Sequence, residues 1–168
     1  MVQFLLATSG IIYFNVKYME IIIKNKKCLI DKEDLNKYSG SHWHVSKGYL
    51  FVSRKIKDKW VNVPISRLIM NAPENLEVDH INRNKLDNRK ENLRLATTSQ
   101  NHANKPKQSN NTSGYKGIHW RKNRNKWIAT IQVNKNRKYL GCSSDIKEVV
   151  KIYNEAAKSY FGNYAYLN

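Results

Sequence analysis

Residues 76–105 read LEVDHINRNKLDNRKENLRLATTSQNHANK, and this stretch decides how the middle of the chain folds. Apolar and polar residues alternate in Leu76–Ile81 as they do in a strand, and Asn92–Ala96 has the same pattern. The ten residues between them are mostly polar and predict a loop. The threonine pair at 97–98 can cap a helix through Ser99–Lys105. The stretch therefore predicts the order strand, loop, strand, helix.

Four side chains with useful chemistry lie at the ends of these elements: Asp79, His80, Asn92 and Asn101. An aspartate and an asparagine oxygen suit a hard cation such as Mg²⁺, held together with several waters. A neutral histidine beside that ion can take a proton from water and direct the water at a phosphodiester. Adjacent strand residues point to opposite sides, which suits a metal and an attacking water on opposite sides of the phosphorus.

The residue types alone leave a second interpretation open. The chain contains 21 Asn, so an asparagine at any chosen spacing is easily found by chance. On residue types alone, a structural histidine satisfied by its neighbours, beside a capping aspartate, is the better interpretation of Asp79 and His80.

Val78–Lys105 resembles the core of the HNH endonucleases, in particular the phage- and intron-encoded homing enzymes, through its runs V-D-H, D-N-R, E-N-L-R and S-Q-N. The resemblance implies a ββα-metal fold that binds one divalent cation, Mg²⁺ or alternatively Mn²⁺. It implies that Asp79 and Asn101 are metal ligands and that His80 is the general base. It also implies that Asn92 braces the loop that orients the histidine. His102, next to Asn101, is the alternative metal ligand.

The same resemblance suggests cations that contact DNA. Asp87-Asn88-Arg89 is expected to shape the loop, and Arg89 or Arg94 to contact phosphate. Upstream, the H-R-L of the family is replaced by Ser66-Arg67-Leu68, so its histidine is missing here. Arg67 is retained, as a phosphate contact or as a support of the core.

Upstream of the core the chain divides into an extension and a β-rich region. Residues 1–18 are largely apolar but too short to span a membrane, and we expect a non-essential extension. Residues 19–60 contain short strand-like runs separated by charged or Gly-containing turns, and the nuclease core is expected over 61–104. His42 and His44 flank Trp43, and surface histidines around a packed Trp are favoured over a metal pair.

The polar, Pro-bearing segment 105–113 predicts a linker to a second module over 114–168. Three alternating runs in this module predict strands, and Asp145–Phe161 carries its apolar residues on one helical stripe before Gly162. Such a three-stranded antiparallel sheet, packed on one α-helix, leaves its other face to solvent. The predicted fold class is therefore α+β, with a ββα-metal module followed by this sheet and helix.

The second module resembles the APETALA/ethylene-response-factor DNA-binding domain, through SGYKGI, KWIATI, KYLG, YNEAAKSYFG and AYLN. In that family the sheet lies in the major groove, with Arg and Trp side chains on bases and phosphates. Several of those arginines are Lys, His or Gln here, and lysine lacks the bidentate fork that arginine offers to guanine. The positions expected to contact DNA are Lys116, His119, Arg121, Lys126, Thr130, Gln132, Arg137 and Tyr139.

The charge of the chain indicates a polyanionic partner. It has 30 Lys+Arg against 13 Asp+Glu, a net charge of +17, and the 53 residues between Glu91 and Asp145 contain no acid. Hydrophobic residues make up 40% of the chain, which argues against disorder. The two Cys cannot form a disulfide framework or a Cys-based zinc site, and buried thiols are expected.

These features predict a metal-dependent HNH DNA endonuclease of the homing type, which nicks or cuts a phosphodiester and carries an appended DNA-binding domain. We expect a monomer that acts on double-stranded DNA and needs neither a membrane nor an obligate protein partner. Its expected location is the cytoplasm, which is the host's cytoplasm if a phage encodes the protein. Two alternatives stay open: a DNA-binding regulator with a degenerate HNH module, and an RNA-binding protein. The regulator would not need Asp79, His80 and Asn101 together, and neither module resembles an RNA reader.

Overall fold

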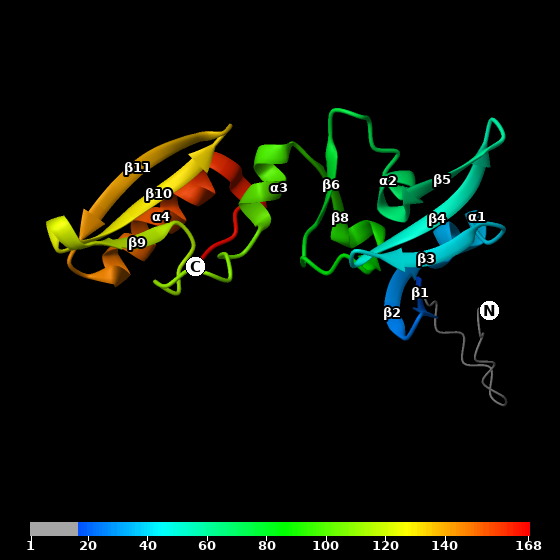
Figure 1. The fold of residues 1–168 in the computed structure, drawn as a ribbon, viewed down its shortest axis with the longest axis horizontal. Coiled ribbons are helices and arrows are strands. Elements are labelled where there is room, and N and C mark those ends of the chain that lie inside the picture. Colours follow the sequence, from blue (N-terminus) through cyan, green and yellow to red (C-terminus); the bar gives the residue numbers. More distant parts are fainter. Residues whose placement is uncertain (1–16) are drawn as a thin grey trace. The chain divides into compact units, whose positions relative to one another are not determined.

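The structure is a computed structural model that describes residues 17–168, and it divides into two compact units between Leu95 and Ala96 (Figure 1). The extension expected over residues 1–18 lies outside the described residues except for its last two. Small sheets and short helices are mixed along the chain, in agreement with a mixed α and β class. No helix within residues 17–168 is long and apolar enough to cross a membrane.

The first unit is built on two three-stranded sheets, one with the strand order β1-β2-β7 and the other with the order β3-β4-β5. A further pair, β6 and β8, forms a two-stranded sheet of its own. The elements in chain order are β1 (Tyr18–Ile23), β2 (Lys26–Asp31), α1 (Lys32–Lys37), β3 (His42–Ser46), β4 (Tyr49–Ile56), β5 (Lys59–Pro64), α2 (Ile65–Ile69), β6 (Glu77–His80), β7 (Asp87–Asn88), the 3-10 turn η1 (Lys90–Asn92) and β8 (Leu93–Ala96).

Two-residue turns join the antiparallel strands of this unit. Lys24-Asn25, Lys47-Gly48 and Lys57-Asp58 all have positive φ angles, the conformation of hairpin turns whose twist matches that of the flanking strands. The charged and Gly-containing turns noted in the sequence are therefore the tips of three β-hairpins.

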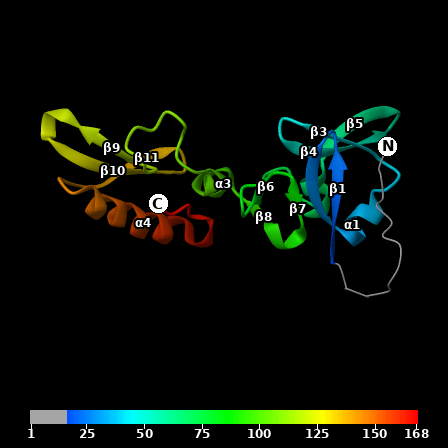
Figure 2. The same ribbon diagram turned by 90° about the horizontal axis from the view of Figure 1, so that it is seen from below.

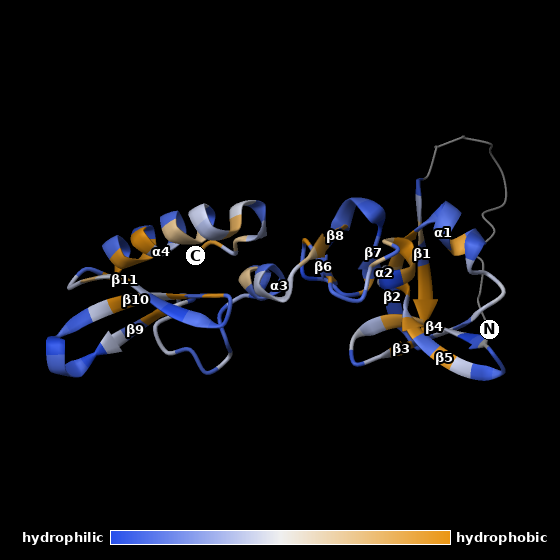
Figure 3. Ribbon diagram, turned by 90° about the horizontal axis from the view of Figure 1, so that it is seen from above, coloured by the Kyte–Doolittle hydropathy of each residue, from blue (hydrophilic) through white to orange (hydrophobic). Residues whose placement is uncertain are grey.

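The core of the first unit is aliphatic and draws on strands and helices from its whole length. Ile30, Leu50, Val52 and Ile65 are at most 1% exposed, and each fully buried side chain of this kind stabilises the fold by about 1.5–3 kcal/mol. Cys28 is also fully buried, as expected, and burial raises the pKa of its thiol to about 11. In Figure 3 β1 and α2 are among the most hydrophobic elements of this unit.

The sequence suggested a boundary between residues 60 and 61, but the first unit has one core that includes residues from both sides of it. β5 crosses that boundary as one continuous strand, and β2 pairs in parallel with β7, which lies in the loop between β6 and β8. Tyr18, expected in the extension, is the first residue of β1 and pairs with Asp31. The N-terminal strands and the loop therefore fold together, because each supplies backbone partners to the other.

The second unit is a three-stranded antiparallel sheet of order β11-β10-β9 with one long helix packed on one face, as the sequence predicted (Figure 2). Ala129 and Ile131 of the sheet meet Val149 and Tyr153 of the helix in its core. The elements are α3 (Thr98–Asn104), β9 (Ile118–Arg121), η2 (Lys122–Arg124), β10 (Lys126–Val133), β11 (Asn136–Ser143), α4 (Ile146–Phe161) and η3 (Gly162–Tyr164).

Helix α3 belongs to this second unit, so the segment 105–113 lies within the unit and does not separate two units as expected. Ala103 is buried in the same cluster as the sheet and α4, and its carbonyl accepts a hydrogen bond from the Tyr166 backbone at 3.0 Å. Thr97 caps the helix from the residue before it, and its side chain accepts from the Gln100 amide in a reciprocal capping box.

Lys116 caps the other end of α3 and does not lie on the exposed sheet face, where it was expected. Its Nζ donates to the carbonyls of His102 at 3.1 Å, Ala103 at 2.6 Å and Lys105 at 2.6 Å. Lys116 precedes β9, so the strand alternation that placed it on the sheet does not reach it. Burial lowers the pKa of Lys116 to about 8, whereas the three carbonyls favour its charged form.

We predict that Lys116→Ala destabilises the second unit, because three carbonyls at the end of α3 lose their donor. The expected loss is about 1–3 kcal/mol. Urea unfolding followed by circular dichroism measures it. Lys126→Ala, which removes the same charge from an exposed position, is the control and should change stability by less than about 0.5 kcal/mol. Equal stability of the two variants would contradict the capping role.

Candidate functional site

Residues 76–105 fold in the predicted order of strand, loop, strand and helix. β6 and β8 pair, and α3 follows after Thr97 (Figure 1). β6, the loop and most of β8 lie in the first unit, whereas α3 and Asn101 lie in the second. The strand and helix bounds are within two residues of those expected, and the loop contains β7 and η1, which the sequence pattern did not indicate.

Asp79 is buried on β6 and carries an ion pair. It is 4% exposed, and its Oδ2 accepts from Arg94 Nε at 2.8 Å and lies 2.6 Å from Arg94 Nη2. Arg94 reaches it from the neighbouring strand β8. A buried carboxylate needs such a partner, because an uncompensated charge is costly to remove from water. The guanidinium of Arg94, expected on phosphate, is therefore engaged inside the fold.

His80, the next residue, is also buried and is held by the loop. It is 5% exposed, and its Nε2 lies 3.3 Å from Oδ1 of Asn88. An amide oxygen only accepts, so this contact puts the hydrogen on Nε2 and the lone pair on Nδ1. Burial lowers the pKa of His80, and the imidazole is therefore neutral at pH 7.

Asn88 is a candidate site residue that the sequence reasoning understated, since the D-N-R run was expected only to shape the loop. It is 1% exposed and belongs to β7, which pairs in parallel with β2 through Leu29↔Asp87 and Ile30↔Asn88. Leu29 also donates from its backbone to the Leu86 carbonyl at 2.8 Å. The contact on His80 therefore depends on a strand more than fifty residues upstream.

Asn92 closes the loop, with each end of its side chain engaged. Its Nδ2 donates to the Asp87 carbonyl at 2.8 Å, and its Oδ1 accepts from the Asn82 amide at 2.9 Å. Its own carbonyl accepts from the Ile81 amide at 2.9 Å. One residue thus connects the first and the last part of the loop and keeps the chain after His80 in place.

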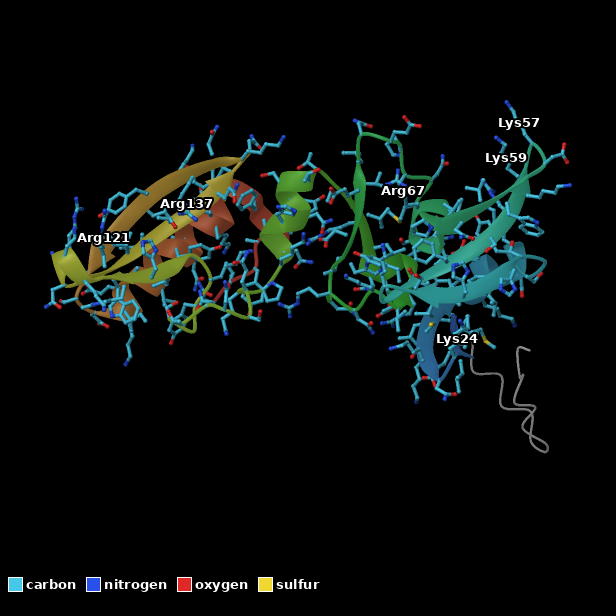
Figure 4. All side chains as sticks on the ribbon, in the orientation of Figure 1. Lys24, Lys57, Lys59, Arg67, Arg121 and Arg137 are labelled. Carbon is cyan, nitrogen blue, oxygen red and sulfur yellow. The ribbon has the colours of Figure 1, made fainter. Side chains whose placement is uncertain are left out.

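Arg89 and Arg67, two further predicted DNA contacts, also hold the fold together. Arg89 donates from Nε and Nη2 to Asp87 at 2.8 and 2.7 Å and from Nη1 to Glu91 at 2.7 Å. Its hydrogen bonds are the main reason that the pKa of Asp87 is lowered. Arg67 donates to three backbone carbonyls in the segment before β6 (Figure 4), those of Leu76 at 2.9 Å, Ala72 at 3.1 Å and Pro73 at 2.8 Å.

A second connection joins the loop to the N-terminal strands through Lys90. Its backbone amide donates to Asp31 Oδ2 at 2.8 Å, and its Nζ pairs with Glu33 and, at 3.4 Å, with Asp34. Burial raises the pKa of Asp34, which makes the nearby ammonium important for keeping it charged. None of these partners of the loop could be identified from spacing, because they lie 56–59 residues away in the chain.

The donor set expected for a metal fits a hard cation by its chemistry. Asp79 offers a carboxylate and Asn101 an amide oxygen, which are ligands that Mg²⁺ accepts together with waters. Within residues 17–168 no three His, Cys, Asp or Glu side chains gather in one group that could hold an ion.

The exposed face of the second sheet collects the remaining predicted DNA contacts. The strand register aligns His119 with Ile128, Arg121 with Lys126, Thr130 with Tyr139 and Gln132 with Arg137. These residues alternate with Ala129 and Ile131, which face α4, so they share the opposite face. Arg121 and Arg137 project from the sheet in Figure 4. Except for Lys116, the predicted residues are thus His119, Arg121, Lys126, Thr130, Gln132, Arg137 and Tyr139, all on one face.

The other aromatic and thiol residues of this sheet differ in their surroundings. Trp127 packs against the core and meets Trp120 edge to face at a centroid distance of 5.1 Å. Cys142 is a half-buried free thiol on the exposed face. A hydrogen bond with Cys142 raises the pKa of Tyr139.

Residues 71–103 match the sequence profile of the HNH endonuclease family. The chain is 33% identical over 93 residues to protein 3.8 of Escherichia phage T7. These aligned residues make up 55% of this chain and 76% of that protein. It is 33% identical over 131 residues to an uncharacterized HNH endonuclease of Acanthamoeba polyphaga mimivirus, over 73% of this chain and 64% of the relative. No solved structure matches the chain.

The matched segment contains Asp79, His80, Asn88 and Asn92, the residues whose contacts organise β6 and its loop. The chain therefore belongs to the family of phage T7 protein 3.8, and its residues 71–103 form an HNH endonuclease domain.

Proposed function

We propose that the protein is a metal-dependent HNH endonuclease of the homing type, which hydrolyses a phosphodiester of double-stranded DNA and holds the DNA with its C-terminal sheet. The observation that carries this proposal is the buried, neutral His80 beside Asp79 on β6, with its tautomer set by Asn88. The match of residues 71–103 to the HNH endonucleases supports a nuclease and a DNA substrate.

His80 acts as the general base. Its neutral imidazole accepts a proton at Nδ1 from the water that attacks the phosphorus, while Nε2 stays bound to Asn88. Asn92 serves as the brace of the loop, since it restrains the backbone on both sides of the turn that follows His80. Positioning the base in this way reduces the entropy lost on reaching the transition state.

Asp79 and Asn101 would hold the divalent cation, Mg²⁺ or Mn²⁺, with His102 as the alternative to Asn101. When bound, the cation supplies a positive charge that stabilises the charge developing on the phosphate oxygens. Arg94 pairs with Asp79 and fixes the direction of its carboxylate. In this proposal Arg67, Arg89 and Arg94 stabilise the catalytic module, and the phosphate contacts come from other cations.

The exposed face of the C-terminal sheet binds the duplex. Cations on this face gain affinity for the duplex by releasing the counterions of the phosphates. The resemblance of residues 114–168 to the APETALA/ethylene-response-factor domain supports this role and the sheet as the contact surface.

One observation favours the alternative of a DNA-binding regulator with a degenerate nuclease module. The carboxylate of Asp79 is already paired with Arg94, as it would be if the pair served only to stabilise the fold. A cleavage assay separates the two functions.

We predict that the protein with Mg²⁺ relaxes or linearises supercoiled plasmid and leaves 5′-phosphate and 3′-hydroxyl ends. His80→Ala should lower the rate by about 10²–10⁴-fold, the usual contribution of a general base. The rates are measured on agarose gels and the ends by sequencing. If the wild-type protein and His80→Ala leave the plasmid equally intact, the protein is a regulator and not a nuclease.

We further predict that removal of divalent ions with EDTA stops cleavage and that Mg²⁺ or Mn²⁺ restores it. Asp79→Ala and Asn101→Ala should weaken Mn²⁺ binding in titration calorimetry, because each removes an oxygen ligand. His102→Ala, next to Asn101 and exposed, should bind the ion as the wild type does. If His102→Ala weakens Mn²⁺ binding and Asn101→Ala does not, His102 is the ligand.

For the DNA-binding face we predict that Arg121→Ala with Arg137→Ala weakens duplex binding most at low salt. Two lost phosphate contacts should reduce the slope of log K against log salt by about 1.8. Fluorescence anisotropy with EDTA present measures the slope. Lys147→Ala with Lys151→Ala, which removes the same charge from exposed positions on α4, should leave the slope unchanged. Equal slopes for both double variants would exclude the sheet face as the contact surface.

A further inference from the structure

The β-hairpin formed by β4 and β5 extends beyond the core of the first unit (Figure 1). Its inner part is buried through Leu50 and Val52, but Arg54, Lys55 and residues 57–62 are all exposed. Register pairing continues to the tip, where Ile56 faces Lys59 across the turn Lys57-Asp58. The outer half of the hairpin is therefore a two-stranded ribbon that projects into solvent and supports no core.

This ribbon is strongly basic. Residues 54–59 contain Arg54, Lys55, Lys57 and Lys59 against a single acid, Asp58, which pairs with Lys55 at 2.9 Å. Lys57 and Lys59 lie at the tip and point away from the strands in Figure 4. Like charges this close repel one another unless a polyanion lies nearby, so the concentration of cations indicates a negatively charged partner.

An exposed tryptophan lies among these cations. Trp60 is 70% exposed and faces Lys55 across the strands. The register places it on the same face of the sheet as His44, Phe51 and Ser53. The rings of His44 and Phe51 stack at a centroid distance of 5.5 Å. Ser53 donates a hydrogen bond to Asn62 at 2.6 Å. A solvated turn does not need such a side chain, whereas a nucleic-acid surface combines cations with exposed aromatic rings.

We propose that the β4–β5 ribbon is a second DNA-contact surface, which enters a groove of the duplex beside the cleaved bond. Lys57 and Lys59 contact phosphates on the two sides of the groove, and Trp60 packs against sugars and base edges. A two-stranded ribbon is narrow enough for the major groove, which is about 12 Å wide. The proposal rests on the proposed function in one respect, namely that the substrate is duplex DNA.

The ribbon would add a contact that the C-terminal sheet cannot supply. It belongs to the unit that contains Asp79 and His80, so its contact fixes the nuclease module itself on the DNA. Loss of the ribbon should therefore reduce cleavage more than a similar loss of affinity through the C-terminal sheet.

The test uses two variants of the whole chain. One is the double variant Lys57→Ala/Lys59→Ala, and the other is the single variant Trp60→Ala. The lysine pair should reduce the slope of log K against log salt by about 1.8, as two lost phosphate contacts do. Trp60→Ala should weaken duplex binding by about fivefold or more without changing that slope, because it removes a contact that carries no charge. Anisotropy with EDTA measures both, and circular dichroism confirms that the variants are folded.

The matched control is Lys24→Ala with Lys26→Ala, at the tip and on the strand of the β1–β2 hairpin. Both positions are exposed, and the pair removes the same charge from the same unit. The control should bind as the wild type does. Hydroxyl-radical footprinting should show that the Lys57/Lys59 variant loses protection at a position that the Arg121/Arg137 variant retains.

The outcomes separate the two proposals. If the wild type binds and cuts DNA but the ribbon variants have the affinity, slope and footprint of the control, the ribbon is not a DNA contact and the endonuclease function stands. If the wild type binds no duplex DNA, both proposals fail. If the ribbon variants bind DNA normally but lose binding to RNA or a protein, the ribbon serves another partner and the inference is overturned.

Discussion

The loop between β6 and β8 is polar and partly buried, and its buried hydrogen-bonding groups need partners inside the fold. Asn92 meets this constraint from within the loop, because its side chain accepts from Asn82 and donates to Asp87. The contact between His80 and Asn88 depends on that arrangement, since His80 comes before the loop and Asn88 lies in its second half. A fold that left this loop free would not determine the tautomer or the direction of the imidazole.

The N-terminal strands complete the same arrangement. β7 has only two residues and cannot form a sheet alone, so its pairing with β2 supplies the backbone hydrogen bonds that keep Asn88 in place. Lys90 adds a backbone hydrogen bond to Asp31 and ion pairs with Glu33 and Asp34. The region before the HNH stretch thus folds together with it, and the burial of Ile30 and Leu50 contributes to the stability of the candidate site.

The large positive charge divides into cations that stabilise the fold and cations that face solvent. Arg67, Arg89, Arg94 and Lys116 each have partners among carboxylates or backbone carbonyls, so their charge is used within the protein. Arg121 and Arg137 on the C-terminal sheet and Lys57 and Lys59 on the β4–β5 ribbon face outward instead. Only the second kind is available to phosphate without breaking an existing interaction, which is why net charge alone does not locate a DNA-binding surface.

The sequence by itself determined the order strand, loop, strand, helix around Asp79 and His80, the antiparallel sheet with its amphipathic helix, and the seven residues on its exposed face. These features depend on local periodicity, and alternation or a helical stripe can be recognised within one segment. The partners of Asp79, His80 and Lys116, the pairing of β2 with β7 and the assignment of α3 to the second unit were decided only by tertiary structure. They join residues far apart in the chain or outside a regular element, where spacing carries no signal, and burial selects among many equivalent Asn, Arg and Lys side chains.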